Sequence, residues 1–398
     1  MGLPSCIALH ARDCDGPHRQ HDRRETPPQQ RHDRGGALAG LIACLMSLAA
    51  LPAIAETLKI ATYNAELSRR GPGLLLRDIQ SGRDVQVQAA VTVIAAASPD
   101  ILLLTGIDYD HGLVALGAFA GELEKAGASY QYLFARRPNT GMASGLDLDG
   151  DGRLGGPGDA QGYGAFAGEG GMAILSRLPI REGDAHDYSA FLWSDLPDNL
   201  IKGAVPSEAE PIQRLSSTAH WAVPVEVPGK GLLTLLAWYG APPVFDGPED
   251  RNGRRNHDET AFWLHLMDGR LPWPAPPAPF VILGDANLDP VDGEGRADSL
   301  EALLRDPRLQ DPMPRSDGGA AAAGRDSRNR DHGGDPGLDT VDWSAKGGPG
   351  NMRVDYVLPS AAITVTDAGV WWPAMGPDAS TAETASRHRL VWVEIDLP

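Results

Sequence analysis

The chain has 398 residues, which is enough for one large domain or two domains of ordinary size. Hydrophobic residues make up 42% of the sequence and can form a buried core, whereas aromatic residues make up only 6%. The formal net charge is −18, and a surface of this charge repels polyanions at long range and attracts metal cations. Nucleic acid is therefore a possible partner only through a local basic patch, and it is not favoured.

Residues 1–55 are predicted to be an export signal. Residues 36–55 carry no charged side chain and end in Ala-Ile-Ala, the pattern of small residues that precedes signal cleavage. The apolar run is also close to the length of a membrane span, so an uncleaved anchor is the alternative. Residues 1–34 are long for the first region of a signal, which a start codon assigned too far upstream would explain. We expect an exported protein, periplasmic or secreted, with no membrane span after signal removal.

All three cysteines lie in the predicted signal, at Cys6, Cys14 and Cys44. Without residues 1–55, which hold six arginines and five acidic residues, 29 basic and 48 acidic residues remain, for a net charge of −19. The mature chain, residues 56–398, is thus expected to have neither disulfides nor thiol chemistry. Any stabilising link would be of another kind, such as a bound metal.

Short apolar runs alternate with helical patterns along the rest of the chain. Strands are expected at residues 58–64, 101–104, 171–176, 232–238, 280–283, 354–358 and 390–395, and helices at 85–97, 258–267 and 297–304. Continuous apolar runs of this length are typical of strands buried on both faces, so the order predicts a layered α/β domain. Two irregular insertions, at about 138–170 and 312–350, are long enough to be functional or disordered.

Four polar motifs end or follow predicted strands. They are Thr62-Tyr63-Asn64-Ala65-Glu66, Leu283-Gly284-Asp285-Ala286-Asn287, Val354-Asp355-Tyr356-Val357-Leu358 and Ser386-Arg387-His388-Arg389. Singly, an Asn or Asp at a strand end is more often a turn residue than a catalyst. Together the motifs offer amides, carboxylates and an imidazole, which are the groups needed to attack a phosphate with a metal-bound or carboxylate-activated water.

The order and the amino-acid sequences of these motifs resemble those of the endonuclease/exonuclease/phosphatase superfamily. This superfamily includes pancreatic deoxyribonuclease, abasic-site endonucleases and inositol-phosphate phosphatases. The phrase Gly-Met-Ala-Ile-Leu-Ser-Arg-Leu-Pro-Ile at 171–180 strengthens the resemblance, which spans residues 58–396. It implies a four-layer α-β-β-α sandwich of two mixed sheets with outer helices. It also implies hydrolysis of a phosphomonoester or phosphodiester with Mg²⁺ or Mn²⁺ at the active site.

The resemblance assigns catalytic roles to five residues. Asp285 would orient and deprotonate the attacking water. Asn287 and Asn64 would donate hydrogen bonds to phosphate oxygens, and Tyr239 falls where relatives place a His or Tyr that contacts the phosphate. His388 would stabilise the charged transition state or protonate the leaving group.

The metal side of the site departs from the family pattern. Glu66 falls where the family has a metal-site acid, and Asp355 would hold the metal or orient His388. The family usually has Glu, as the principal ligand, where this chain has Gly106. Asp108, two residues further on in an extended chain, would point to the same face and could replace that ligand, alone or together with Asp110. The alternative is that the metal site is weakened or lost.

Three arginines are candidate phosphate ligands. Arg387 stands where the family commonly has Asp, and its guanidinium suits bidentate contacts with phosphate, although it could also face solvent. Arg251 and Arg254 belong to a cluster of Arg and Asn that follows the Tyr239 strand. That cluster either binds phosphate or forms a charged surface loop before the next helix.

A separate acidic motif predicts a calcium loop. Asp147, Asp149 and Asp151 occupy positions 1, 3 and 5 and Gly152 position 6, as at the start of an EF-hand loop. The loop lacks Glu at position 12, but Asp159 at position 13 could close a structural Ca²⁺ site. The alternative is a solvated turn.

The sequence thus predicts a monomeric phosphoesterase with a small phosphoester substrate. The alternative is an exported, catalytically degraded protein that binds calcium and a phosphorylated ligand. The departures at Gly106 and Arg387 support that alternative.

Overall fold

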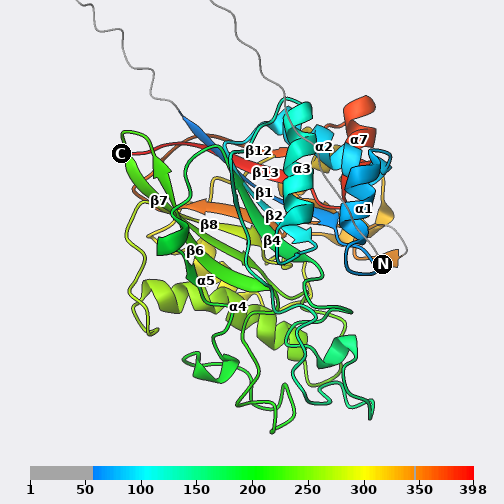
Figure 1. The fold of residues 1–398 in the computed structure, drawn as a ribbon, viewed down its shortest axis with the longest axis vertical. Helices are drawn as coiled ribbons and strands as arrows, with labels where there is room; N and C mark the ends of the chain where they lie inside the picture. The colour runs from blue at the N-terminus through cyan, green and yellow to red at the C-terminus, as the bar shows by residue number, and fades with distance from the viewer. Residues whose placement is uncertain (1–56, 345–346) are drawn as a thin grey trace, which may run out of the picture. The chain divides into compact units, whose positions relative to one another are not determined.

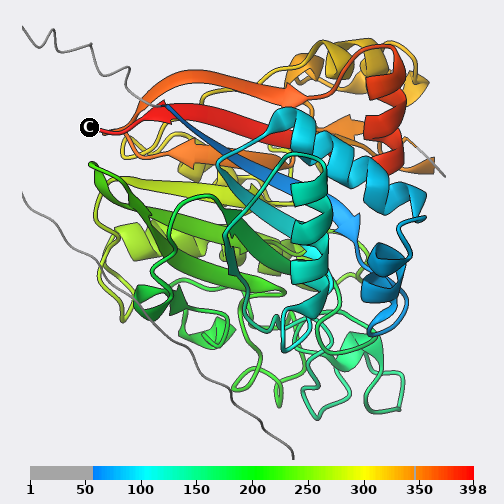
Figure 2. The same cartoon turned by 45° about the horizontal axis from the view of Figure 1, so that its top comes forward.

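A computed structural model describes residues 57–344 and 347–398, so the predicted signal, residues 1–55, lies outside the described residues. Two β-sheets pack face to face, and helices cover their outer faces (Figures 1 and 2). This arrangement confirms the predicted four-layer α-β-β-α sandwich. Within the described ranges, the helices are too short or too polar to cross a membrane.

The first sheet has six strands and is mixed. In spatial order they are β12 (Thr364–Trp371), β13 (Leu390–Asp396), β1 (Leu58–Leu67), β2 (Ile101–Ile107), β4 (Gly171–Ser176) and β3 (Tyr132–Phe134). β1 and β2 are parallel, and the other neighbours are antiparallel. The β1–β2 ladder shifts register after Asn64, and the β2–β4 ladder shifts after Thr105. Both irregularities lie at the end of the sheet that carries the first polar motif.

The second sheet has five strands. In spatial order they are β11 (Asp355–Pro359), β8 (Phe280–Asp285), β7 (Gly231–Tyr239), β6 (Ala219–Val227) and β5 (His186–Asp187). β7 and β8 are parallel, and the other neighbours are antiparallel. A separate hairpin pairs β9 (Val341–Asp342) with β10 (Asn351–Met352).

Side chains of the second sheet alternate between two cores, as expected for a strand buried on both faces. In β8, Val281 and Leu283 belong to the core between the sheets, whereas Phe280 and Ile282 belong to the core beneath the outer helix. Asp285 follows Leu283 by two residues and therefore points to the inner side. The two-residue period of β8 thus determines that Asp285 points toward the space between the sheets.

Helices cover both outer faces (Figures 1 and 2). The first sheet carries α1 (Leu74–Ser81), α2 (Val85–Ala97), α3 (Val114–Lys125) and α7 (Pro377–Ala385), and the second carries α4 (Arg251–Met267) and α5 (Asp298–Leu304). Helix α2 has its predicted bounds because Asp84 accepts a hydrogen bond from the Val87 amide and caps its start. Helix α4 begins seven residues before the predicted position. The prediction missed these residues because the first two turns of the helix are polar.

The two insertions differ in regular structure. Residues 138–170 contain one short 3₁₀ turn (Pro157–Asp159) and isolated bridges. Residues 312–350, predicted to be irregular, contain helix α6 (Asp317–Ala323) and strand β9. The Ala run of α6 has high helix propensity, and the Ser316 hydroxyl caps it by accepting a hydrogen bond from the Gly319 amide. The abundant Gly around this run has low helix propensity, so the sequence did not predict this helix.

Candidate active site

Three polar side chains form a row at the end of the second sheet. The register pairs Tyr239 of β7 with Asp285 of β8, and Asp285 with Asp355 of β11. Asp285 and Asp355 are fully buried. The alternation described above points all three toward the space between the sheets. Residues far apart in sequence are therefore brought together by strand register alone.

Asn64 reaches this row from the first sheet. Its Nδ2 donates a hydrogen bond to Asp285 Oδ2 at 2.9 Å and to the Tyr239 hydroxyl at 3.2 Å. Its Oδ1 accepts a hydrogen bond from the Glu66 amide at 3.2 Å. One amide thus links the two sheets at the centre of the predicted site and orients the carboxylate of Asp285.

The turn after β8 places Asn287 beside Asp285. The Asn287 amide donates to Asp285 Oδ1 at 2.8 Å, and Asn287 Nδ2 donates to the Gly240 carbonyl at 2.9 Å. Asn287 has a φ of 51°, a conformation that Asn adopts more readily than most residues. Both oxygens of Asp285 therefore accept amide hydrogen bonds, which fix the direction of the carboxylate.

His388 and Asp355 form a buried pair. His388 Nδ1 lies 3.0 Å from Asp355 Oδ2 and 3.8 Å from Asp285 Oδ2, and His388 Nε2 lies 3.4 Å from Asn64 Nδ2. The same oxygen of Asp355 accepts a hydrogen bond from the Thr340 hydroxyl at 2.8 Å. The sequence reading left two roles open for Asp355, and the contacts match the one in which it orients His388.

The second insertion contributes to the site, which the sequence reading missed. Thr340 supports Asp355, and the ring of Trp343 lies edge-on to His388 with centroids 5.6 Å apart. Residues 340–342 pair with 387–389 through backbone hydrogen bonds. No short motif marks Thr340, because its role depends on a long-range pairing of two irregular segments.

Burial and neighbouring charges shift the pKa values of the central groups. Burial, together with the charge of Asp355, raises the pKa of Asp285 above its usual range. Burial alone would lower the pKa of His388, but the carboxylates of Asp355 and Asp285 outweigh it and raise that pKa. The raised pKa makes Asp285 a stronger base than a free Asp, and the raised pKa of His388 favours its protonated form.

Glu66 lies in an ion pair with Arg387. Arg387 Nε donates to Glu66 Oε1 at 2.7 Å, and Nη2 contacts the same oxygen. Glu66 Oε2 accepts from the Arg387 amide at 2.8 Å and from the Ser386 hydroxyl at 3.2 Å. Arg387, predicted to bind phosphate or to face solvent, thus binds the acid that was predicted to hold the metal.

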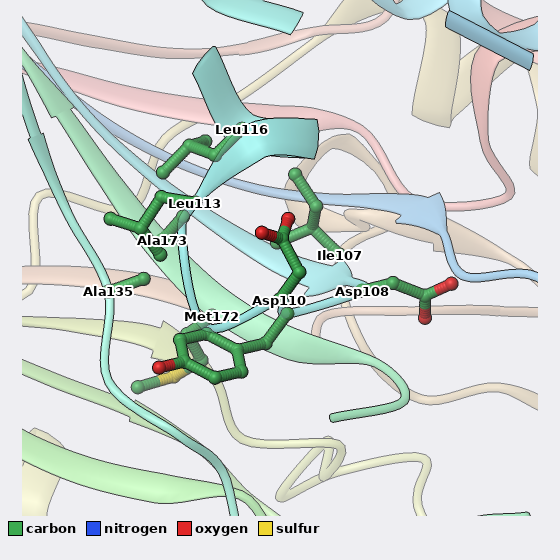
Figure 3. Close-up of a pocket in the computed structure, with 9 residues that line it drawn as sticks. Ile107, Asp108, Asp110, Leu113, Leu116, Ala135, Met172 and Ala173 are labelled. Carbon is green, nitrogen blue, oxygen red and sulfur yellow. The ribbon is translucent and has the colours of Figure 1, made fainter. Parts of the chain in front are cut away.

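The replacement ligands proposed after Gly106 have other partners. Asp108 accepts hydrogen bonds from Ser68 Oγ at 2.7 Å and from the amides of Arg69 and Gly170 at 2.9 and 3.1 Å. Asp110 accepts bonds from the first amides of α3 and caps that helix. Figure 3 shows the two carboxylates pointing in different directions, so they do not converge on one ion.

The acidic loop after position 146 brings its three aspartates close together. Asp147, Asp149 and Asp151 each offer an oxygen, and these atoms lie within 4.8 Å of one another. Asp159, predicted to close a calcium site, is buried and accepts hydrogen bonds from the amides of Leu148 and Gly156 at 2.7 and 3.0 Å. Asp159 therefore holds the loop together by accepting hydrogen bonds from backbone amides of the loop.

A cleft of about 1110 Å³ extends from Tyr239 to this acidic loop. Exposed Tyr163 and Phe245 line it, together with Asp149 and Arg251. The other predicted phosphate ligand, Arg254, donates to the Lys202 carbonyl at 2.9 Å, and it is not among the residues lining the cleft. Arg251 and Arg254 both lie in the first turn of α4 and not in a loop.

Comparison with known proteins decides the family. The sequence model of the Endonuclease/Exonuclease/phosphatase family matches residues 61–388. The chain belongs to this family. Members of the family are nucleases and phosphoesterases, so the chain is a hydrolase that acts on phosphoric ester bonds. A comparison with curated protein sequences finds no match.

Solved structures of other proteins also match this chain. An endonuclease/exonuclease/phosphatase from Beutenbergia cavernae is 18% identical, with a TM-score of 0.51 over 86% of this chain and 72% of that one. A family protein from Leptotrichia buccalis is 14% identical, with a TM-score of 0.47 over 85% and 100% of the two chains. The catalytic domain of human Nocturnin is 12% identical, with a TM-score of 0.44 over 86% and 95%.

Endonuclease/Exonuclease/phosphatase proteins use divalent metal ions, and acidic clusters occur in this chain. The residues predicted to hold Mg²⁺ or Mn²⁺ do not fit such an ion. The carboxylate oxygens of Glu66 and Asp108 are bound to other groups, and Gly106 supplies no ligand. The Asp285, Asp355 and His388 group also has its ligand atoms within 4.8 Å, and Asp355 Oδ1 has no hydrogen-bond partner in the described structure. His388 Nδ1 lies 3.0 Å from Asp355 Oδ2, so the imidazole and this carboxylate are paired with each other in the described structure.

Proposed function

We propose that this chain hydrolyses a phosphomonoester or phosphodiester by direct attack of a water molecule that Asp285 activates. The observation that carries the proposal is the buried row at the sheet end, in which Asn64 and Asn287 fix both oxygens of Asp285. A carboxylate held this way, with a raised pKa, is suited to accept a proton from water.

In the proposed step one bond to phosphorus forms, another breaks, and two protons are transferred. The water oxygen forms a bond to phosphorus while its proton passes to Asp285. The bond from phosphorus to the leaving oxygen breaks, and that oxygen takes the proton of His388. Asp355 and Thr340 hold the imidazole in place. Asn287 and the hydroxyl of Tyr239 are the candidate donors to phosphate oxygens, because both hydrogens of Asn64 Nδ2 serve Asp285 and Tyr239.

We propose a small phosphoester as the substrate class. The cleft beside Tyr239 has room for an organic group, and Tyr163 and Phe245 offer it apolar surface. Its acidic side chains, such as Asp149, and the negative net charge oppose a polyanion. Nucleic acid therefore remains a disfavoured substrate under this proposal.

We also propose that the acidic loop binds Ca²⁺ as a structural ion and that the chain is an exported monomer. Alternate carboxylates that converge within 4.8 Å are the donors this cation prefers. Calcium should raise the melting temperature of the wild type but not of an Asp147→Ala, Asp149→Ala double variant. An unchanged wild-type melting curve would refute the calcium site.

Cell fractionation with N-terminal sequencing tests the proposed export and signal cleavage, and sedimentation tests whether the chain is a monomer.

The test of the hydrolytic function uses bis-p-nitrophenyl phosphate and a panel of small phosphoesters, with EDTA, Mg²⁺, Mn²⁺ or Ca²⁺. We expect Asp285→Asn and His388→Ala each to lose about 100-fold or more of the wild-type rate. Asp378→Asn, an exposed change of the same type on α7, is the matched control and should keep full activity. Full activity in both central variants would contradict the proposed roles. A wild type that gains stability but no turnover with any ion would instead indicate the binding protein considered above.

A further inference from the structure

The pair formed by Glu66 and Arg387 holds a guanidinium on the residue that precedes the catalytic histidine. We infer, on the basis of the proposed function, that the guanidinium of Arg387 supplies the positive charge that the phosphate requires, so that hydrolysis at this centre needs no divalent cation. Family membership leads one to expect a metal here, and the inference concerns what this chain has in its place.

The arginine is held by several contacts. Two of its nitrogens, Nε and Nη2, meet Glu66 Oε1, while Glu66 Oε2 accepts the Arg387 amide and the Ser386 hydroxyl. Both oxygens of Glu66 are therefore occupied by donors of the segment that carries His388. A divalent ion at Glu66 would first have to displace a guanidinium that already neutralises its charge.

The pair lies next to the reacting groups. The Ser386 hydroxyl donates to the Asn64 carbonyl at 2.7 Å and accepts from the His388 amide at 3.0 Å. The Glu66 amide donates to Asn64 Oδ1. A shared set of hydrogen bonds thus connects the arginine, the amide that orients Asp285 and the proton-donating imidazole.

The neighbouring strand leaves no room to rebuild a metal ligand. Gly106 has a φ of 67°, which side chains rarely adopt, and a Cβ atom there would overlap Asn64 Oδ1. The position that could have offered a carboxylate is thus filled by the side chain of Asn64. Loss of a ligand at Gly106 and the presence of a cation at Arg387 are consistent with each other.

Arginine has the chemistry for this role. Its guanidinium is always charged, and its planar donors match two phosphate oxygens at once. The side chain is 59% exposed, so its outer edge is open to solvent. Among the hydrogen bonds of the described residues, Nε and Nη2 serve Glu66 and none involves Nη1. A phosphate in the centre could therefore bind the arginine without breaking its pair with Glu66.

The test compares the full-length wild type with Arg387→Asp, Arg387→Lys and Arg387→Ala in two measurements. The first is the hydrolysis rate in excess EDTA and after addition of Mg²⁺ or Mn²⁺. We expect an unchanged wild-type rate, a loss of about 100-fold in Arg387→Ala and a smaller loss in Arg387→Lys, which keeps the charge. Arg387→Asp frees Glu66 and adds a second carboxylate, so its activity should depend on added metal.

The second measurement is the rise in melting temperature with Mn²⁺, which requires no turnover. We expect a larger rise in Arg387→Asp than in the wild type, and the acidic loop, identical in both, cancels in the comparison. Arg305→Ala breaks a Glu–Arg pair of α5 and is the matched control, with wild-type behaviour in both measurements.

Two results would overturn the inference. One is a wild type that EDTA inactivates and Mg²⁺ or Mn²⁺ restores. The other is equal stabilisation of wild type and Arg387→Asp by Mn²⁺. A wild type that hydrolyses nothing under any condition refutes the proposed function instead, and the Mn²⁺ comparison then still decides whether this centre holds a metal.

Discussion

Two carboxylates and one imidazole share a small buried space in this site, and their charges decide its chemistry. Asp285 and Asp355 are fully buried, and His388 Nδ1 lies within 3.8 Å of an oxygen of each. Two like charges so close cannot both be ionised cheaply unless a cation lies between them. His388, whose pKa these two carboxylates raise, can serve as that cation. Removing the charge of Asp355 should therefore lower the pKa of both Asp285 and His388.

Asp355→Asn should move both limbs of the pH–rate profile to lower pH. The charge of Asp355 raises the pKa of both Asp285 and His388. Without it, Asp285 loses its proton at lower pH, which moves the acid limb down. His388 also loses its proton at lower pH, so the alkaline limb, where the proton donor is lost, moves down as well. The measurement is kcat/KM against pH. Thr340→Val keeps the charge of Asp355 and should shift the limbs less, and an unmoved alkaline limb in Asp355→Asn would contradict the assignment of His388.

At the scale of elements, the end of β2 shows how one glycine shapes the site. The β1–β2 and β2–β4 ladders both shift register near Gly106, and the Asn64 side chain occupies the space beside it. The irregular strand ends thus let an amide of the first sheet reach the carboxylate of the second.

Gly106→Ala should therefore impair both stability and hydrolysis. The positive φ alone should cost about 1 kcal/mol of unfolding free energy, and displacement of Asn64 should lower kcat as well. Gly82→Ala is the matched control, since Gly82 has a φ of 61° and open space around it. Urea unfolding and steady-state kinetics of both variants give the comparison. Equal kcat in the two variants would show that the space beside Gly106 is not important for catalysis.

Elements with a strong local pattern could be predicted from the sequence, and those that depend on long-range pairing could not. The apolar runs of β4 and β8 and the capped helix α2 carry their own signals. The row of Tyr239, Asp285 and Asp355 was expected as a set of strand ends, but its register is a property of the assembled sheet. The ion pair of Glu66 with Arg387 had no sequence signal, because it joins residues 321 positions apart.

At the scale of the whole molecule, one buried histidine should link stability to pH. His220 is fully buried in the second sheet, with Nδ1 2.8 Å from Ser216 Oγ and Nε2 2.9 Å from the Glu259 carbonyl. Burial lowers its pKa to about 4. The unfolded chain therefore binds a proton at mildly acidic pH that the folded chain does not.

His220 should accordingly favour folding above its unfolded pKa and lose that contribution as the pH falls toward its folded pKa. Between about pH 7 and about pH 4.5 we expect the wild type to lose about 2 kcal/mol of unfolding free energy from this group. His220→Gln should lack this part of the pH dependence, whereas the exposed His111→Gln should keep it. Urea unfolding at the two pH values provides the measurement, and equal slopes in wild type and His220→Gln would exclude the linkage.

The central claim is that Asp285 activates the water that attacks phosphorus. Its most direct test is the single-turnover rate constant of the Asp285→Asn variant on bis-p-nitrophenyl phosphate, because enzyme in excess isolates the chemical step from product release. We expect this rate constant to fall by about 100-fold or more relative to the wild type, with an unchanged melting temperature as proof of folding. A folded Asp285→Asn variant that hydrolyses the substrate as fast as the wild type would contradict the claim.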